Sequence, residues 1–108
     1  MGMNGNLDDV TVGNNETAQR YEARVAGQLA VITYQQLGDR IVFIHTEVPE
    51  ALEGHGIAGK MAQFALEDAR AQGLAVIPQC PFVAGYIRRH LEYADLVPPD
   101  DRARLVTR

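Results

Sequence analysis

Apolar and polar residues alternate through much of the first half of the chain. Tyr21, Ala23 and Val25 are separated by charged residues, and this period of two is typical of a β-strand with one buried face. Similar segments rich in β-branched and aromatic residues follow, separated by short turn-like segments. The pattern predicts three strands in an antiparallel meander that ends before Pro49. Their ranges are 19–25, 29–36 and 40–48.

The apolar positions of residues 57–72 recur with a helical period instead. Glu67, Asp68 and Arg70 fall on the side expected to face solvent, and Gly73 is suited to end the helix. The apolar positions expected to face the core are Ile57, Met61, Phe64, Ala65, Leu66 and Ala69.

A short strand and a second helix are predicted after this first helix. Residues 74–81 are almost wholly apolar, which indicates a strand at a buried position in the sheet. Residues 82–96 predict a helix with a break near Leu91. The order β-β-β-α-β-α predicts an α+β fold, in which helices pack on a mixed, mostly antiparallel sheet.

Neither end of the chain carries a clear pattern. Residues 1–16 are rich in Gly, Asn and Asp, so we expect a disordered N-terminal arm. Residues 99–108 are polar and begin at a proline-rich stretch, so we expect an irregular C-terminal tail. The ordered domain is therefore expected to span residues 17–98.

Composition narrows the class of protein. The chain has 108 residues with a net charge of −4 and no stripe of Lys and Arg, which argues against a nucleic-acid partner. No apolar run approaches the roughly 20 residues of a membrane helix, and the start lacks the apolar core of a signal peptide. A single cysteine excludes an internal disulfide and fits a reducing compartment. We expect a cytoplasmic domain with no membrane partner.

Three glycines, Gly54, Gly56 and Gly59, stand where the first helix must begin. Glycine costs a helix about 1 kcal/mol relative to alanine, so their presence there needs a reason. The first N–H groups of a helix have no partner within it, and glycines let a phosphate approach such groups closely. The segment therefore predicts an anion-binding loop.

Two common nucleotide-binding motifs fit this loop poorly. The six residues 54–59 match the letters GxGxxG, but antiparallel strands precede them, whereas a dinucleotide fold requires a parallel unit. The order of a Walker A loop is absent. A flexible loop without a ligand remains an alternative.

The stretch "EGHGIAGK" and its surroundings resemble the small, single-domain branch of the GNAT N-acetyltransferase superfamily, over residues 16–98. The superfamily signature Q/R-x-x-G-x-G/A appears as Glu53-x-x-Gly56-x-Ala58, with Glu in place of Gln or Arg. The resemblance implies that backbone N–H groups of this loop bind the pyrophosphate of acetyl-CoA. The implied cofactor-binding residues are Glu53, Gly54, His55, Gly56, Ile57, Ala58, Gly59 and Lys60.

His45 and Cys80 are the candidate catalytic residues. Alternation places His45 and Glu47 on the same face of their strand as Ile41 and Phe43, and Cys80 lies at the end of the next strand. In GNAT proteins these two strands are adjacent and part around the thioester. The resemblance therefore implies that both side chains face the acetyl group, a pairing similar to that of the small branch.

Two routes of acetyl transfer remain open. An amine can attack acetyl-CoA directly while His45 takes its proton, since the ordinary pKa of histidine suits a base near neutral pH. Alternatively, Cys80 is acetylated first and passes the group on. Structural roles for both residues, a core cysteine and a satisfied histidine, are the competing interpretation.

Tyr86 is a further candidate cofactor-binding residue, because the resemblance implies a tyrosine in this helix that protonates the leaving thiolate of CoA. Packing of an aromatic ring in the core is the alternative. His45, His55, His90 and Cys80 lack the spacing of metal ligands, so we expect no metal site.

The sequence therefore predicts an acetyl-CoA-dependent N-acetyltransferase acting on an unidentified amine: a protein lysine, a peptide or a small amine. A non-catalytic module that binds CoA or acyl-CoA is the alternative function. The chain lacks the pair of helices that usually walls the acceptor site in the superfamily, which implies an open acceptor cleft.

Overall fold

The computed structural model describes residues 10–105, in which five strands form one sheet in chain order. Neighbouring strands are antiparallel except for the last pair, which is parallel. The strands are β1 (Thr11–Asn15), β2 (Arg20–Val25), β3 (Gln28–Leu37), β4 (Arg40–Glu47) and β5 (Ala75–Pro78). The predicted α+β fold, with its mixed and mostly antiparallel sheet, is confirmed.

Two α-helices and three 3₁₀ segments complete the described chain. The helices are α1 (Ile57–Ala71) and α2 (Pro81–Arg89). The 3₁₀ segments are η1 (Glu50–Leu52), η2 (Leu91–Leu96) and η3 (Pro99–Leu105). The predicted break near Leu91 is confirmed, since α2 ends at Arg89 and η2 begins two residues later. Neither helix of the described chain is long and apolar enough to span a bilayer.

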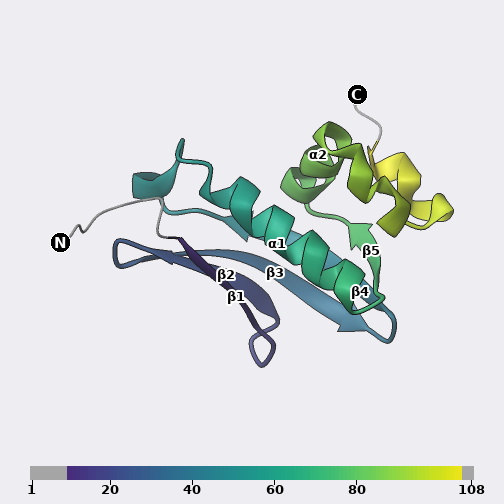
Figure 1. The fold of residues 1–108 in the computed structure, drawn as a ribbon, viewed down its shortest axis with the longest axis horizontal. Coiled ribbons are helices and arrows are strands. Elements are labelled where there is room, and N and C mark those ends of the chain that lie inside the picture. The colour runs from purple at the N-terminus through teal and green to yellow at the C-terminus, as the bar shows by residue number, and fades with distance from the viewer. Residues whose placement is uncertain (1–9, 106–108) are drawn as a thin grey trace.

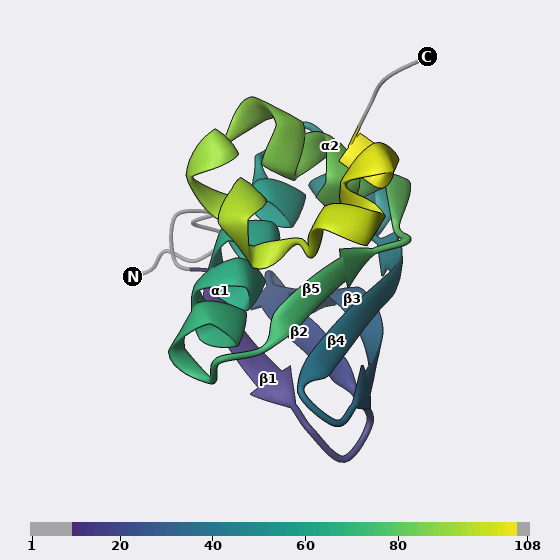
Figure 2. The same ribbon diagram turned by 90° about the vertical axis from the view of Figure 1, so that its right-hand side faces the viewer.

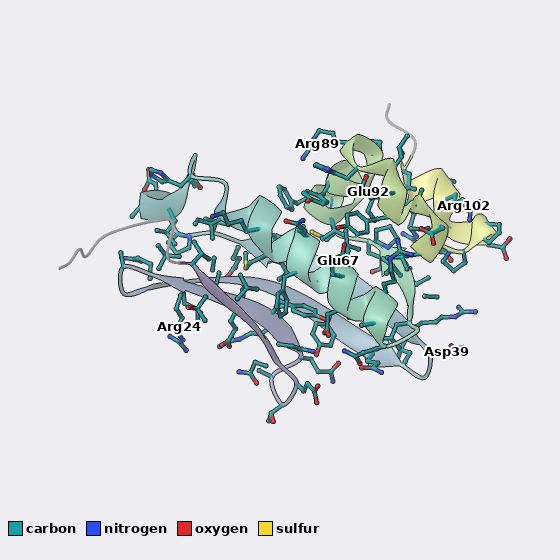
Figure 3. All side chains as sticks on the ribbon, in the orientation of Figure 1. Arg24, Asp39, Glu67, Arg89, Glu92 and Arg102 are labelled. Atoms are coloured by element: carbon teal, nitrogen blue, oxygen red, sulfur yellow. The ribbon has the colours of Figure 1, made fainter. Side chains whose placement is uncertain are left out.

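The core lies between the sheet and the two helices. Tyr21, Ala23 and Val25 are buried as their alternation predicted, and they join residues of α1 and α2 in one cluster. α1 runs along the sheet, and α2 packs beside β4 and β5 (Figures 1 and 2). Arg24 projects from the sheet away from the helices (Figure 3). One face of the sheet therefore supports the core, while the other carries charged side chains such as Arg24 together with apolar ones such as Val31 and Ile44.

The predicted disordered arm is wrong for Thr11–Asn15, which form β1 against β2. Val12 packs against the core, and Asn14 bonds to both α1 and β3: its amide donates to Asp68 and its Oδ1 accepts from the Tyr34 hydroxyl at 2.7 Å. Asn14, part of the composition from which disorder was predicted, therefore connects β1 to α1 and to β3. The part of the expected arm at residues 1–9 lies outside the described residues.

The C-terminal end also differs from its prediction. Instead of an irregular tail, Pro99–Leu105 form η3, because Leu105 packs against the core and Arg102 donates to the Val97 carbonyl at 2.9 Å. Residues 106–108 lie outside the described chain.

The position of β5 in the sheet differs in part from the prediction. Its side chains are mostly buried, as expected, but β5 is an edge strand of the sheet rather than an inner one.

α1 ends in a Schellman motif, so the expected role of Gly73 is confirmed. Gly73 has φ +71°, its N–H donates to the Arg70 carbonyl, and the N–H of Leu74 donates to the Ala69 carbonyl.

Glu67 links α1 to the 3₁₀ segment η2. Its carboxylate accepts a 2.6 Å hydrogen bond from the Tyr93 hydroxyl, and this bond together with burial raises the pKa of Tyr93 to about 12. Glu67 is labelled in Figure 3.

Asp68 does not face solvent as predicted but joins α1 to the sheet. Its carboxylate accepts from the Tyr21 hydroxyl at 2.7 Å and from the Asn14 amide at 3.3 Å. Burial and this carboxylate raise the pKa of Tyr21. The contact therefore holds β1 and β2 under the helix.

Asp68→Ala should lower the free energy of unfolding by about 1–3 kcal/mol, because the buried Tyr21 hydroxyl loses its acceptor. Asp95→Ala is the matched control: it breaks an exposed pair with Arg70, so a loss of about 0–1 kcal/mol is expected. Urea denaturation of the two variants measures both values. Equal losses would show that Asp68 does not anchor the helix.

Candidate functional site

The loop before α1 presents unpaired backbone donors. Gly54 and Gly56 have φ of +84° and +75°, and Gly56 begins the helix without any side-chain cap. The first bond of the helix runs from the Lys60 N–H to the Gly56 carbonyl. Among hydrogen bonds of the described chain, none is donated by the backbone N–H groups of residues 54–59. Such a row at a helix N-terminus attracts anions.

A hollow of about 260 Å³ lies against this loop, and we call it the loop hollow. Apolar side chains and glycine backbone make up most of its wall. Its lining residues are Val48, Leu52, Glu53, Gly54, Gly56, Ile57, Ala58, Gly59 and Phe82. Six of the eight predicted cofactor-binding residues therefore lie together.

The other two predicted loop residues lie elsewhere. His55 is exposed and does not line the loop hollow. Lys60 lines a separate hollow, beside Val12 of β1 and Phe64 of α1. The helical turn that follows Gly56 directs Lys60 toward β1, so the structure does not place it with the loop hollow.

β4 and β5 part beside the start of α2. Their parallel pairing runs only from Arg40 and Ala75 to Phe43 and Pro78. The N–H of Cys80 then donates to the Phe43 carbonyl at 2.8 Å, while β4 continues along β3 to Glu47. Cys80 occupies the N-cap of α2 and is 2% exposed. The predicted adjacency of β4 and Cys80 is confirmed.

A register shift in β4 changes which of its side chains face the core. Tyr34 pairs with Phe43, but Thr33 pairs with His45, so Ile44 is an extra residue on β4. Alternation inverts after this bulge: Phe43 is buried, Ile44 is 45% exposed and Thr46 turns inward. Thr46 Oγ1 lies 3.1 Å from Cys80 Sγ.

The predicted face of His45 and Glu47 is therefore wrong. Their side chains are 60% and 71% exposed, whereas Phe43 is buried. Thr46, not His45, contacts Cys80, because adjacent residues of a strand point to opposite faces. Sequence reasoning missed Thr46, since a strict period of two carries no sign of a bulge.

His45 instead lines a second hollow of about 480 Å³, the His45 hollow. Its imidazole Nε2 is 3.4 Å from Glu47 Oε2. The lining residues are Leu29, His45, Thr46, Glu47, Val48, Pro49 and Glu53. Val48 and Glu53 line both hollows, so the two adjoin across this segment.

Tyr86 packs behind the loop. Its ring is stacked on His90 at 4.0 Å, and a Cβ on Gly59 would lie 3.8 Å from it. Burial raises the pKa of its hydroxyl. Phe82, rather than Tyr86, lines the loop hollow. These contacts favour the packing role over protonation of a thiolate.

Metal binding has no support in the described chain: residues 10–105 contain no group of three or more His, Cys, Asp and Glu side chains placed to hold an ion.

Gly56→Ala should destabilise the protein by about 1–2 kcal/mol, because its positive φ is strained for a residue with a Cβ. Gly13→Ala is the control: Gly13 has open space around it and no positive φ, so little change is expected. Urea denaturation compares the two. Similar stabilities would argue against a left-handed start to α1.

Comparison with known proteins shows the family to which this chain belongs. Residues 20–96 match the family model of the GCN5-related N-acetyl-transferase. Protein NATD1 of Mus musculus is 31% identical over 84 residues, which cover 75% of this chain and 76% of the relative. Protein NATD1 of Homo sapiens is 31% identical, with 75% and 74% covered, and that of Xenopus tropicalis is 27% identical, with 75% and 77% covered. The chain belongs to the GCN5-related N-acetyltransferase family.

Proposed function

We propose that the protein transfers the acetyl group of acetyl-CoA to an amine. The observation that carries this proposal is the row of backbone N–H groups at residues 54–59, which make no hydrogen bond within residues 10–105 and lie at a hollow that Phe82 of α2 also lines. Members of this family generally use acetyl-CoA. The loop is suited to an anionic diphosphate, and the adjoining hollows leave room for a donor and an acceptor.

Acetyl-CoA is expected to bind with its diphosphate on the N-terminus of α1. There the helix dipole and the free N–H groups favour negative charge. Gly54, Gly56, Ile57, Ala58 and Gly59 would provide the backbone surface, and Phe82 would contact an apolar part of the molecule.

His45 is proposed as the base that prepares the acceptor. The acceptor loses a proton to His45, and its nitrogen lone pair attacks the thioester carbonyl. A C–N bond forms and the C–S bond breaks, and the second proton of the acylated nitrogen passes to the departing CoA thiolate, while His45 releases the first proton to solvent. The products are an acetylated amine and free CoA.

Direct transfer accounts for the geometry better than an acetyl-cysteine route. His45 and Thr46 point to opposite faces of β4, and Thr46 is the residue that contacts Cys80. His45 is thus badly placed to deprotonate the Cys80 thiol. We propose that Cys80 and Thr46 form the wall behind the thioester.

We further propose a cytosolic location, because the single cysteine has no partner within the chain for a structural disulfide.

Ala58→Glu should weaken acetyl-CoA binding by roughly tenfold or more, since like charges about 4 Å apart repel by roughly 1–4 kcal/mol. The same acidic residue in the first turn should leave stability unchanged or raise it slightly. Ala58→Gln is the neutral control of similar size, with affinity expected to stay closer to the parent. Isothermal calorimetry gives the affinities, and equal values for the two variants would refute the diphosphate site.

His45→Ala should slow acetyl transfer by about 10²–10⁴-fold, as expected for loss of a general base, without weakening acetyl-CoA binding. Cys80→Ala should transfer acetyl at a rate close to that of the parent and show no acetyl group on the protein. Consumption of acetyl-CoA and mass spectrometry measure these results. Acetyl found on Cys80 of the parent would favour the cysteine route. Binding without consumption across a panel of amines would favour a CoA-binding module.

A further inference from the structure

We propose that the His45 hollow is the acceptor site and that it selects an aliphatic diamine or polyamine. This inference rests on the proposed acetyl transfer, because it assigns the acceptor of that reaction. Three properties of the hollow support it: its position, its charge and its apolar wall.

The position places an acceptor next to the proposed base and donor. His45 lines the hollow directly, and Thr46 both lines it and contacts Cys80 beside the parting of the strands. Val48 and Glu53 form a wall shared with the loop hollow. Thr46 leads from the His45 hollow to the parting of the strands, so an amine in this hollow can reach a thioester at the end of the shared wall.

Charge in the hollow favours a cation. Glu47 and Glu53 contribute carboxylates, and no Lys or Arg is among the lining residues. Glu47 Oε2 lies 3.4 Å from His45 Nε2, whereas within residues 10–105 the Glu53 carboxylate has neither an ion pair nor a hydrogen bond. A carboxylate without a partner in a concave site concentrates positive charge. Glu53 can therefore attract the second ammonium group of an acceptor whose reacting amine lies at His45.

The apolar part of the wall fits an alkyl chain. Leu29, Val48 and Pro49 line the hollow between or beside its polar groups. A site that joins aliphatic side chains to a few charged groups binds ligands of the same mixed character. An alkyl chain with an ammonium group at each end has this character, whereas a zwitterion would bring a carboxylate toward Glu47 and Glu53.

Glu53 gains a physical explanation from this assignment. It holds the first position of the loop signature, where a carboxylate would repel the diphosphate of acetyl-CoA. Its place in the shared wall lets the same charge attract an acceptor in the His45 hollow. Neutralising Glu53 should therefore leave acetyl-CoA affinity unchanged or improve it.

The test compares three acceptors that differ only at the end distant from the reacting amine: cadaverine, pentylamine and δ-aminovalerate. Steady-state consumption of acetyl-CoA by the full chain gives kcat/KM for each. We expect cadaverine to exceed pentylamine by roughly fivefold, the size of an exposed ion pair of about 1 kcal/mol, and δ-aminovalerate to be the poorest. Glu53→Gln should remove the advantage of cadaverine, and the advantage should shrink in high salt.

Glu92→Gln is the control, because it removes the same charge from η2, away from the hollow (Figure 3). It should keep the preference for cadaverine. Equal kcat/KM for the three acceptors, or a preference that persists in Glu53→Gln, would overturn the acceptor assignment while leaving acetyl transfer intact.

Titration of cadaverine followed by NMR separates this inference from the proposed function. Chemical-shift changes at residues of the His45 hollow that vanish in Glu53→Gln would support the amine site even if no acetyl-CoA were consumed. In that case only the proposed acetyl transfer would be refuted. Absence of both shifts and consumption would overturn the amine site together with the proposed function.

Discussion

The short pairing of β4 with β5 is the constraint on which the site depends. After Phe43 and Pro78 the ladder between the two strands ends, and the Cys80 N–H to the Phe43 carbonyl is the last backbone hydrogen bond to β4 on this side. α2 begins at this point because Pro81 cannot donate to the sheet and suits the first turn of a helix. β4 meanwhile continues along β3. The resulting gap brings Thr46 and Cys80 into contact beside the loop of α1.

Elements with strong local signals were predictable from the sequence. Alternation identified β2 to β4, helical periodicity identified α1, and Gly73 marked its end. The glycine loop was also predictable, because positive φ at Gly54 and Gly56 is a local requirement. β1 was not, since its asparagines acquire partners such as Asp68 only when the chain is folded.

The face of His45 could not be predicted for a different physical reason. Register is a property of two strands, and one extra residue at Ile44 turns every later side chain of β4 to the other face. Nothing in the period of β4 itself distinguishes Ile44 from its neighbours. The structure brings several of the candidate residues near one another, but their arrangement depends on a tertiary contact. This is why His45 and Cys80 do not meet.

Two kinds of charge lie close together around the segment from Val48 to Glu53. On one side of the Val48–Glu53 segment, free N–H groups at the start of α1 create a field that favours anions. On the other side, Glu47 and Glu53 favour cations. A diphosphate donor and an ammonium acceptor would each be repelled by the site of the other. The fields would therefore sort the two substrates to opposite sides of one short segment, with the reacting groups meeting where β4 leaves β5.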